Sequence, residues 1–183
     1  MAAGSMGNRA MSELYLLRHA KAAPQAEGGT DRDRPLEQRG RRAAQAVAGW
    51  IAEHRIAPAL VLCSPSLRTR QTLDIVTLAF PRPPEILIED GLYLASTSQL
   101  LARLRQVPGD TAGVMIVGHN PGFQELTILL SEVASGPLVA RLAGFPTGAL
   151  ARYEVTVGWS RLDRRSARLV AVALPKELLR GEE

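Results

Sequence analysis

The stretch from Leu14 to Ala20 constrains this chain more than any other, because an apolar run leads directly into an Arg-His pair. The apolar half is typical of a buried strand in a parallel or mixed sheet. Arg18 and His19 follow where that strand should end, and ligands of open α/β sheets collect at the carboxyl ends of strands. An arginine there can hold an anion with its forked donors, and a histidine can attack phosphorus or move protons. The stretch therefore indicates an anion-binding or catalytic strand end.

The composition favours one globular domain that attracts anions. A length of 183 residues, with 46% hydrophobic and 22% charged residues, suits a single domain with a sizeable core. The formal net charge of +4 is compatible with nucleic-acid binding, but only 4% of the residues are aromatic. No stretch interleaves basic and aromatic residues as a base-stacking surface does. We therefore expect small anions or phosphorylated surfaces as partners, and no nucleic acid.

The scarcity of cysteine and histidine argues against a metal site. A single cysteine, Cys63, excludes an intramolecular disulfide and a multi-cysteine zinc site, and the three histidines are scattered. No apolar run approaches the roughly 20 residues that span a bilayer, and residues 1–12 lack the apolar core of a signal peptide. We interpret residues 1–12 as an N-terminal extension or a cloning remnant and residues 13–183 as one domain. The expected protein is a cytoplasmic monomer without metal, cofactor or membrane partner.

Hydrophobic periodicity predicts an alternation of strands and helices after the first strand. The predicted strands are 59–63, 85–89, 113–117, 149–157 and 167–174, and the predicted helices begin at about residues 36, 65, 97 and 121. Ser64 should cap the second of these helices, which should run to about Phe80 with a core face that includes Leu78. Thr97 or Ser98 should cap the third. The order predicts a three-layer α/β/α sandwich with a mostly parallel central sheet and antiparallel edge strands from a terminal hairpin.

Three predicted strand ends carry chemically capable side chains. They are Arg18-His19, Ser64 with Arg68 just inside the next helix, and His119-Asn120. Because the carboxyl ends of parallel strands meet at one edge of a sheet, these side chains should converge. Two arginines and two histidines beside two helix N-termini form a phosphate pocket that also contains a nucleophile for phosphoryl transfer.

The same segments resemble the signatures of the histidine phosphatase superfamily, which includes the phosphoglycerate mutases. Leu16–Ala20 resembles the Arg-His signature, Ser64–Thr72 the second signature and Val117–Pro121 the third. The compact length, Ala20 in place of the usual glycine, and Asp31–Leu36 resemble the SixA-like phosphohistidine phosphatases most. The resemblance implies a phosphoglycerate mutase-like fold and a phosphatase that requires no cofactor.

The resemblance also implies roles for individual residues. His19 would be the nucleophile, transiently phosphorylated, and water would then release phosphate. The nearby arginines favour a neutral imidazole, whose other ring nitrogen we expect to donate to a backbone carbonyl. The residues expected to contact the phosphoryl group or the rest of the substrate are Arg18, Arg68, His119, Asn120 and Arg34.

No motif identifies a general acid. The candidates are Asp31, Asp33, Glu89 and Asp90. Asp31 is the first choice, because it lies in the loop after the nucleophile and fits the SixA-like pattern. A phosphohistidine leaves as an imidazole, a far better leaving group than an alkoxide, so such a substrate depends less on an acid.

Three functions fit these observations. The leading expectation is a phosphatase that acts through a phosphohistidine intermediate on phosphohistidine in a protein. The second is a phosphatase of small phosphate esters, but specific members of that kind usually carry a lid, and the chain has little room for one between Pro84 and Gly113. The third is a catalytically silent module that binds phosphoproteins. The presence of both histidines and both arginines argues against it, because a binding module does not need His19.

Overall fold

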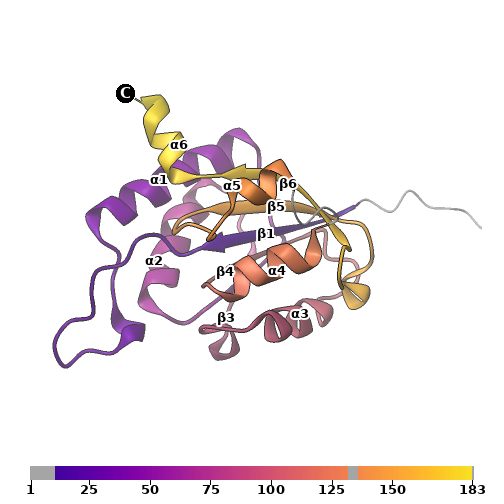
Figure 1. Cartoon of the computed structure of the whole chain (residues 1–183), viewed down its shortest axis with the longest axis horizontal. Coiled ribbons are helices and arrows are strands. Elements are labelled where there is room, and N and C mark those ends of the chain that lie inside the picture. The colour runs from indigo at the N-terminus through magenta and orange to yellow at the C-terminus, as the bar shows by residue number, and fades with distance from the viewer. Residues whose placement is uncertain (1–10, 132–135, 183) are drawn as a thin grey trace, which may run out of the picture.

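In the computed structural model, residues 11–131 and 136–182 are described. They form one six-stranded sheet in the order β3-β2-β4-β1-β5-β6 (Figure 1). The strands are β1 (Ser12–Arg18), β2 (Leu60–Cys63), β3 (Glu85–Ile88), β4 (Gly113–Gly118), β5 (Leu150–Val155) and β6 (Ala167–Ala173). The pairs β1–β4, β4–β2 and β2–β3 are parallel, whereas β1–β5 and β5–β6 are antiparallel. The predicted α/β class, with a terminal antiparallel hairpin at one edge, is confirmed.

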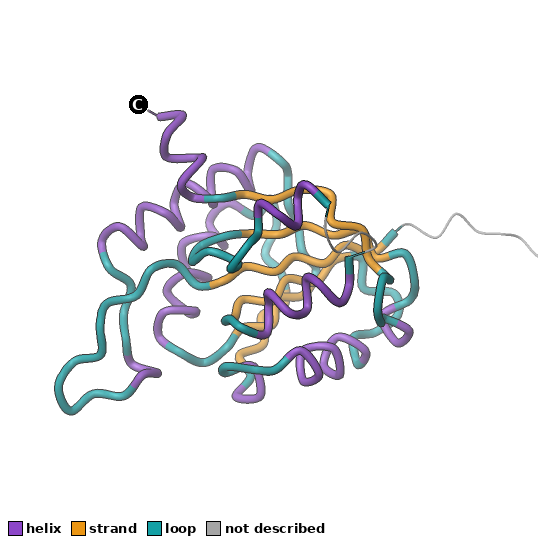
Figure 2. The backbone as a smooth tube through the Cα atoms, in the orientation of Figure 1, coloured by secondary structure: helices purple, strands orange, loops and turns teal. Residues whose placement is uncertain are grey.

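Helices cover both faces of this sheet (Figure 2). They are α1 (Gln38–Glu53), α2 (Leu67–Val76), α3 (Thr97–Arg105), α4 (Gly122–Leu130), α5 (Pro137–Arg141) and α6 (Pro175–Leu178). Alternate residues of each strand point to opposite faces, so Leu14 and Leu16 of β1 pack with α3 and α4. Tyr15 and Leu17 pack with α1 and α2 on the other face. None of the helices in residues 11–131 and 136–182 combines the length and apolar character needed to cross a membrane.

Several predicted helix details are wrong. Ser66, not Ser64, is the N-cap residue of α2, and the side chain of Ser64 bonds instead to His119 across the sheet edge. Leu78, predicted to face the core, is 88% exposed. The α-helix ends at Val76, and the next residues form a 3₁₀ turn, whose tighter winding rotates them away from the helical face.

The remaining differences concern helix ends. The N-cap of α3 is Ser96, one residue before the predicted cap, and Gln99 completes a capping box with it. The short helices α5 and α6 have too few turns to produce an apolar periodicity in the sequence. Residues 1–10 of the expected extension lie outside the described residues, and β1 already includes Ser12.

Gly40 lets α1 approach the segment that follows the Arg-His pair. A Cβ atom at this position would lie 2.1 Å from the carbonyl oxygen of Lys21, which is too close for any residue other than glycine. The same segment is fixed by a hydrogen bond from the backbone N–H of Glu37 to that carbonyl, at 2.9 Å. The glycine in the first turn of α1 therefore serves a close packing contact next to the site, at some cost in helix propensity.

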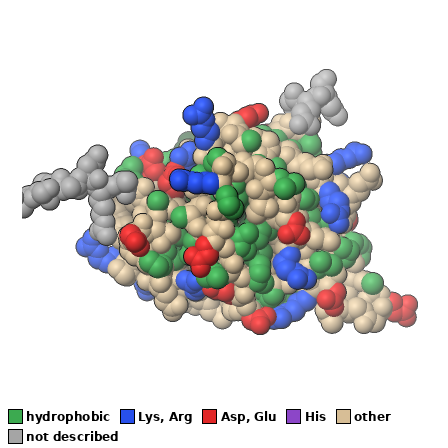
Figure 3. All heavy atoms as spheres, turned by 180° about the vertical axis from the view of Figure 1, so that it is seen from behind, with side chains coloured by type: hydrophobic (Ala, Val, Ile, Leu, Met, Phe, Trp, Pro, Cys, Tyr) green, Lys and Arg blue, Asp and Glu red, His purple; other side chains and the backbone are tan. Residues whose placement is uncertain are grey.

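Charges are mixed on the face of the molecule shown in Figure 3. Lys and Arg side chains alternate there with Asp and Glu side chains and with apolar groups. A surface that binds the phosphate backbone of a nucleic acid gathers cations into a stripe or patch. This face has no such patch.

Candidate active site

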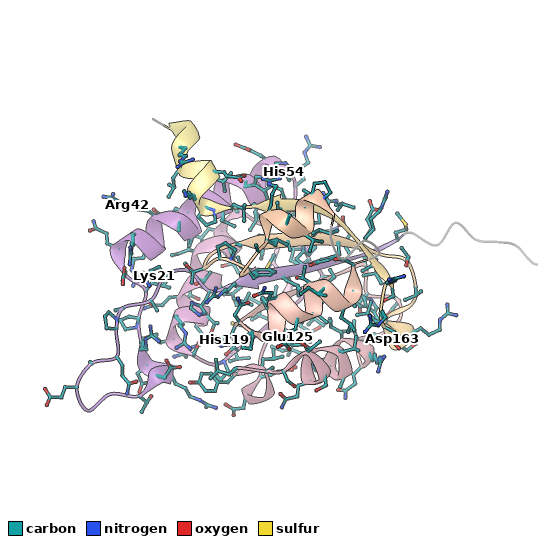
Figure 4. The ribbon with its side chains drawn as sticks, viewed as in Figure 1. Lys21, Arg42, His54, His119, Glu125 and Asp163 are labelled. Carbon is teal, nitrogen blue, oxygen red and sulfur yellow. The ribbon has the colours of Figure 1, made fainter. Side chains whose placement is uncertain are left out.

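Three strand ends meet at one edge of the sheet, as the sequence predicts. Strands β2, β4 and β1 are neighbours, and Arg18 lies opposite Gly118 in the parallel register. The backbone N–H of His19 donates to the carbonyl of Gly118 at 3.1 Å, which holds the first signature beside the third. The backbone N–H of Ser64 donates to the carbonyl of Val117 at 3.0 Å, which holds the second signature beside the third as well. Figure 4 shows Lys21 and His119 at this end of the molecule.

These strand ends open into a cleft of about 410 Å³. Every residue that the sequence assigns to the site lines it. The lining residues are Arg18, His19, Lys21, Ala22, Asp31, Arg34, Arg68, Tyr93, Leu94, His119, Asn120 and Thr147. The structure thus brings the assigned residues together, while their individual roles stay predictions.

His19 has the tautomer that a nucleophile needs. Its Nδ1 lies 2.8 Å from the carbonyl oxygen of Ala20 and donates to it, which leaves Nε2 with a free electron pair. In the resting site, Nε of Arg68 lies 3.3 Å from Nε2 of His19 and donates to that electron pair. Burial and the neighbouring arginines lower the pKa of His19 to about 4, although the bond to Ala20 acts in the opposite direction. The ring is therefore neutral at physiological pH.

We expect His19 to stay neutral from pH 8 down to about pH 5. A group whose pKa is lowered in the folded state remains unprotonated until the pH falls through the lowered value. An NMR titration of the ring resonances measures this, with the urea-unfolded protein as control, in which the ring should titrate near its ordinary value of about 6.5. A midpoint near 6.5 in the folded protein would contradict this account of the site.

His119 is the second imidazole of the cleft. Its ring centroid lies 5.2 Å from that of His19, and its Nε2 lies 2.7 Å from the hydroxyl oxygen of Ser64. Burial, together with the neighbouring His19, Arg68 and Arg18, lowers the pKa of His119 to about 3, and Asp31 acts in the opposite direction. Ser64 was predicted to cap a helix with its hydroxyl facing the site; it does not cap the helix, but its hydroxyl bonds to this site histidine.

Arg68 is 3% exposed and is held by the loop that follows β1. Its guanidinium donates to the backbone carbonyl of Asp31 at 2.5 Å and to the carboxylate at 2.8 Å. Tyr93 and Arg34 also donate to this carboxylate, at 2.6 and 2.8 Å. The hydrogen bonds from Tyr93, Arg34 and Arg68 hold the pKa of Asp31 well below its usual range. The expected general acid is therefore a carboxylate in the resting site, and its acid role stays a prediction that requires prior release from these donors.

The other candidate acids lie outside the cleft. Glu89 forms an ion pair with Arg103 at 2.8 Å, and Asp90 forms one with Arg32 at 3.1 Å. Neither these two carboxylates nor Asp33 lines the cleft. Among the four candidates, Asp31 is the one that a substrate in the cleft could reach.

Arg18 and Asn120 are anchored by one loop. Arg18 donates through Nη1 to the carbonyl of Phe145 at 2.6 Å, and Asn120 donates through Nδ2 to the carbonyl of Gly144 at 2.7 Å. In the described part of the chain, the buried side-chain nitrogen and oxygen atoms without a partner are Arg18 Nε, His119 Nδ1 and Asn120 Oδ1. Buried polar groups are normally paired. All three atoms belong to residues that line the cleft.

Tyr93 is a site residue that the sequence analysis missed. Besides its bond to Asp31, its ring lies edge-on to His119, with centroids 5.5 Å apart. The guanidinium carbon of Arg32 lies 4.4 Å from the centre of the Tyr93 ring. These contacts join the loop after β3 to the loop after β1, and no local sequence pattern encodes such a contact between loops.

The cleft draws its positive charge from side chains. Arg18, Arg34 and Arg68 line it together with Lys21. Within residues 11–131 and 136–182, no group of three or more His, Cys, Asp or Glu residues is arranged to hold a metal ion. A neutral histidine with forked cationic donors around it at parallel strand ends is an arrangement suited to phosphoryl transfer.

Comparisons with known proteins agree with this class. Residues 14–93 match the family model of the histidine phosphatase superfamily, branch 1. A proposed phosphohistidine phosphatase SixA of Nakamurella multipartitia has a similar structure, with a TM-score of 0.79 and 31% identity over 90% of this chain and 96% of that one. A second proposed SixA, from Agrobacterium tumefaciens, gives a TM-score of 0.75 and 33% identity over 90% and 99%. An uncharacterised Mycobacterium tuberculosis protein is 31% identical over 87% of this chain and 100% of its own length.

The chain belongs to the histidine phosphatase superfamily and is SixA-like. Its fold is that of the phosphoglycerate mutase-like proteins, and its neighbours support a phosphatase that acts on a phosphate-bearing substrate.

Proposed function

We propose that this protein removes the phosphoryl group from phosphohistidine in another protein, through a phosphorylated His19. The observation that carries the proposal is the state of Asp31, the candidate acid in the cleft, which Arg68 and Tyr93 hold as a carboxylate. An alkoxide needs protonation as it leaves, and a resting carboxylate cannot supply it. An imidazole already protonated on its second nitrogen leaves as a neutral molecule and needs no acid from the enzyme.

The first step transfers the phosphoryl group to His19. Its Nε2 electron pair attacks phosphorus, the P–N bond of the substrate breaks, and the substrate imidazole departs as a neutral ring. Arg18 and Arg68 neutralise the oxygens of the transferring group, which is the main requirement of such a step. The product is a phospho-imidazolium, because Nδ1 of His19 keeps its proton in the bond to Ala20.

The second step returns the enzyme to its starting state. Water attacks phosphorus, the P–N bond to Nε2 breaks, and one water proton passes to phosphate or solvent. His19 leaves as a neutral imidazole, because Nδ1 is still protonated against the Ala20 carbonyl. The same backbone bond therefore frees the electron pair for attack and makes His19 a good leaving group.

The surroundings of the cleft support a protein substrate. The segment between Pro84 and Gly113 contains β3, a 3₁₀ turn at Asp90–Leu92 and α3, with no inserted domain over the site. Leu94, at the rim of the cleft, is 51% exposed. An uncovered cleft can receive a side chain on the surface of a folded partner. We further propose a cytoplasmic monomer that needs no cofactor.

The proposal is tested by side-by-side hydrolysis of a phosphohistidine protein, p-nitrophenyl phosphate and a panel of sugar phosphates. We expect kcat/KM for the phosphohistidine protein to exceed that for the sugar phosphates by at least about 10²-fold, the lower range of what general acid catalysis is worth. A sugar phosphate hydrolysed faster than the phosphohistidine protein would overturn the proposed substrate.

Asp31→Asn is expected to slow alkyl phosphates far more than phosphohistidine. An alkyl phosphate needs the proton that Asp31 could deliver after release from Arg68, a contribution of about 10²–10⁴ in rate, whereas phosphohistidine does not. The chemical step should be measured by rapid quench, because slow phosphate release would mask the difference. Asp90→Asn, an exposed carboxylate outside the cleft, is the matched control. Equal losses on both substrates would mean that Asp31 positions Arg68 and does not act as an acid.

A further inference from the structure

A fully buried hydroxyl bonds to the second imidazole of the site. Ser64 follows β2, is 0% exposed, and places its hydroxyl oxygen 2.7 Å from Nε2 of His119. In the described part of the chain, this is the hydrogen bond that the Ser64 hydroxyl makes. The bond can be formed in two ways, because either the hydroxyl or the ring nitrogen can carry the shared proton.

Satisfying both groups decides between the two forms. If the protonated Nε2 donated to Ser64, the hydroxyl proton would need another acceptor, and the described residues offer none to this 0%-exposed side chain. A buried donor without an acceptor is costly. If the hydroxyl donates to Nε2, one bond satisfies the hydroxyl proton and Nε2, and the donor that is left over is Nδ1–H of His119, a residue that lines the cleft, whereas Ser64 does not line it. The neutral ring then carries its proton on Nδ1.

Nδ1 of His119 is buried and has no partner among the described residues. His119 lines the cleft, and its ring lies 5.2 Å from the ring of the nucleophile His19. We propose that Ser64 is a positioning residue that fixes His119 as the neutral Nδ1–H tautomer, so that this N–H donates to an oxygen of the phosphoryl group. That the acceptor is a phosphoryl oxygen rests on the proposed function, whereas the assignment of the His119 tautomer does not depend on it.

The proposal gives the two histidines complementary tasks. His19 donates from Nδ1 to a carbonyl and turns an electron pair towards phosphorus, whereas His119 accepts at Nε2 and turns a proton towards oxygen. Burial and the nearby arginines Arg68 and Arg18 make a cationic His119 unfavourable, and the pKa of its ring is lowered accordingly. A neutral N–H donor supports the phosphoryl oxygens without adding a further buried positive charge.

The tautomer can be measured in the resting protein, without substrate. Long-range ¹H–¹⁵N NMR distinguishes a protonated from an unprotonated ring nitrogen, and only three histidines have to be assigned. His54→Ala and His19→Ala spectra provide the assignments. We expect a neutral His119 with the proton on Nδ1. A proton on Nε2, or on both nitrogens at pH 7, would overturn the inference, whatever the substrate proves to be.

Ser64→Ala tests the consequence for catalysis. We expect a mixture of His119 tautomers and a kcat lowered by about 10- to 100-fold, as for other partners that orient a functional histidine. Ser64→Thr keeps the hydroxyl and should retain the Nδ1–H signal and more of the activity. Ser66→Ala is the matched control, since Ser66 is equally buried but bonds to Thr69. An unchanged kcat and an unchanged tautomer in Ser64→Ala would refute the inference.

Discussion

His19→Ala is expected to lower kcat by at least about 10⁴-fold, because a covalent route loses its nucleophile. The cleft of this variant would still bind the phosphoryl group through Arg18 and Arg68. No other described side chain of the cleft combines a free electron pair with the position of Nε2. The measurement is steady-state turnover of a phosphohistidine protein, with thermal unfolding to establish that the variant is folded.

His54→Ala is the control for this substitution. His54 lies at the end of α1, where it stacks on Trp50 with ring centroids 3.8 Å apart, and it does not line the cleft. The His54→Ala variant should therefore keep the turnover rate of the wild-type protein. If His19→Ala retained more than about a hundredth of the wild-type rate in protein free of contaminating phosphatase, His19 would not be the nucleophile.

Arg68→Ala is expected to cost about 2–4 kcal/mol of transition-state stabilisation, or roughly 10²–10³ in kcat. Its guanidinium is buried, preorganised by Asp31 and directed at Nε2 of His19, where the phosphoryl group will sit. Arg70→Ala should change kcat little, because Arg70 lies two residues further along the same helix with an exposed side chain. Similar losses of kcat in the two variants would contradict a specific role of Arg68 in stabilising the transition state.

The arginine substitution has a second readout. The positive charge of Arg68 is one of the causes that lower the pKa of His19. Its removal should raise that pKa towards the ordinary value, which the NMR titration of the ring measures. A loss of rate together with a raised pKa would distinguish the electrostatic role from a purely structural one.

The parallel part of the architecture could be predicted from the sequence because each of the strands β1 to β4 is a short run with apolar residues that precedes a helix-period pattern. The antiparallel hairpin could be predicted because no helix separates β5 from β6. Helix ends were less predictable. Ser64 and Ser66 are equally good N-cap residues in isolation, and the bond of Ser64 to His119, which is far away in sequence, could not be read from the local pattern.

The central residues of the site were predictable for a different reason. Arg18, His19 and His119 directly follow buried strands, so the sheet alone brings them together. Tyr93 and the ionised state of Asp31 were not predictable, because both depend on contacts between separate loops. The sequence could identify Asp31 as a carboxylate near the site, but not the three donors that keep it charged.

The central claim is that the phosphoryl group passes through Nε2 of His19. The most direct measurement is a rapid base quench of the wild-type protein during turnover of a ³²P-labelled phosphohistidine protein, followed by mapping of the label. We predict one phosphoryl group on His19, stable in base, labile in acid and absent from the His19→Ala protein. Label on Ser64, Asp31 or another residue, or no label when substrate is consumed in a pre-steady-state burst, would contradict the account.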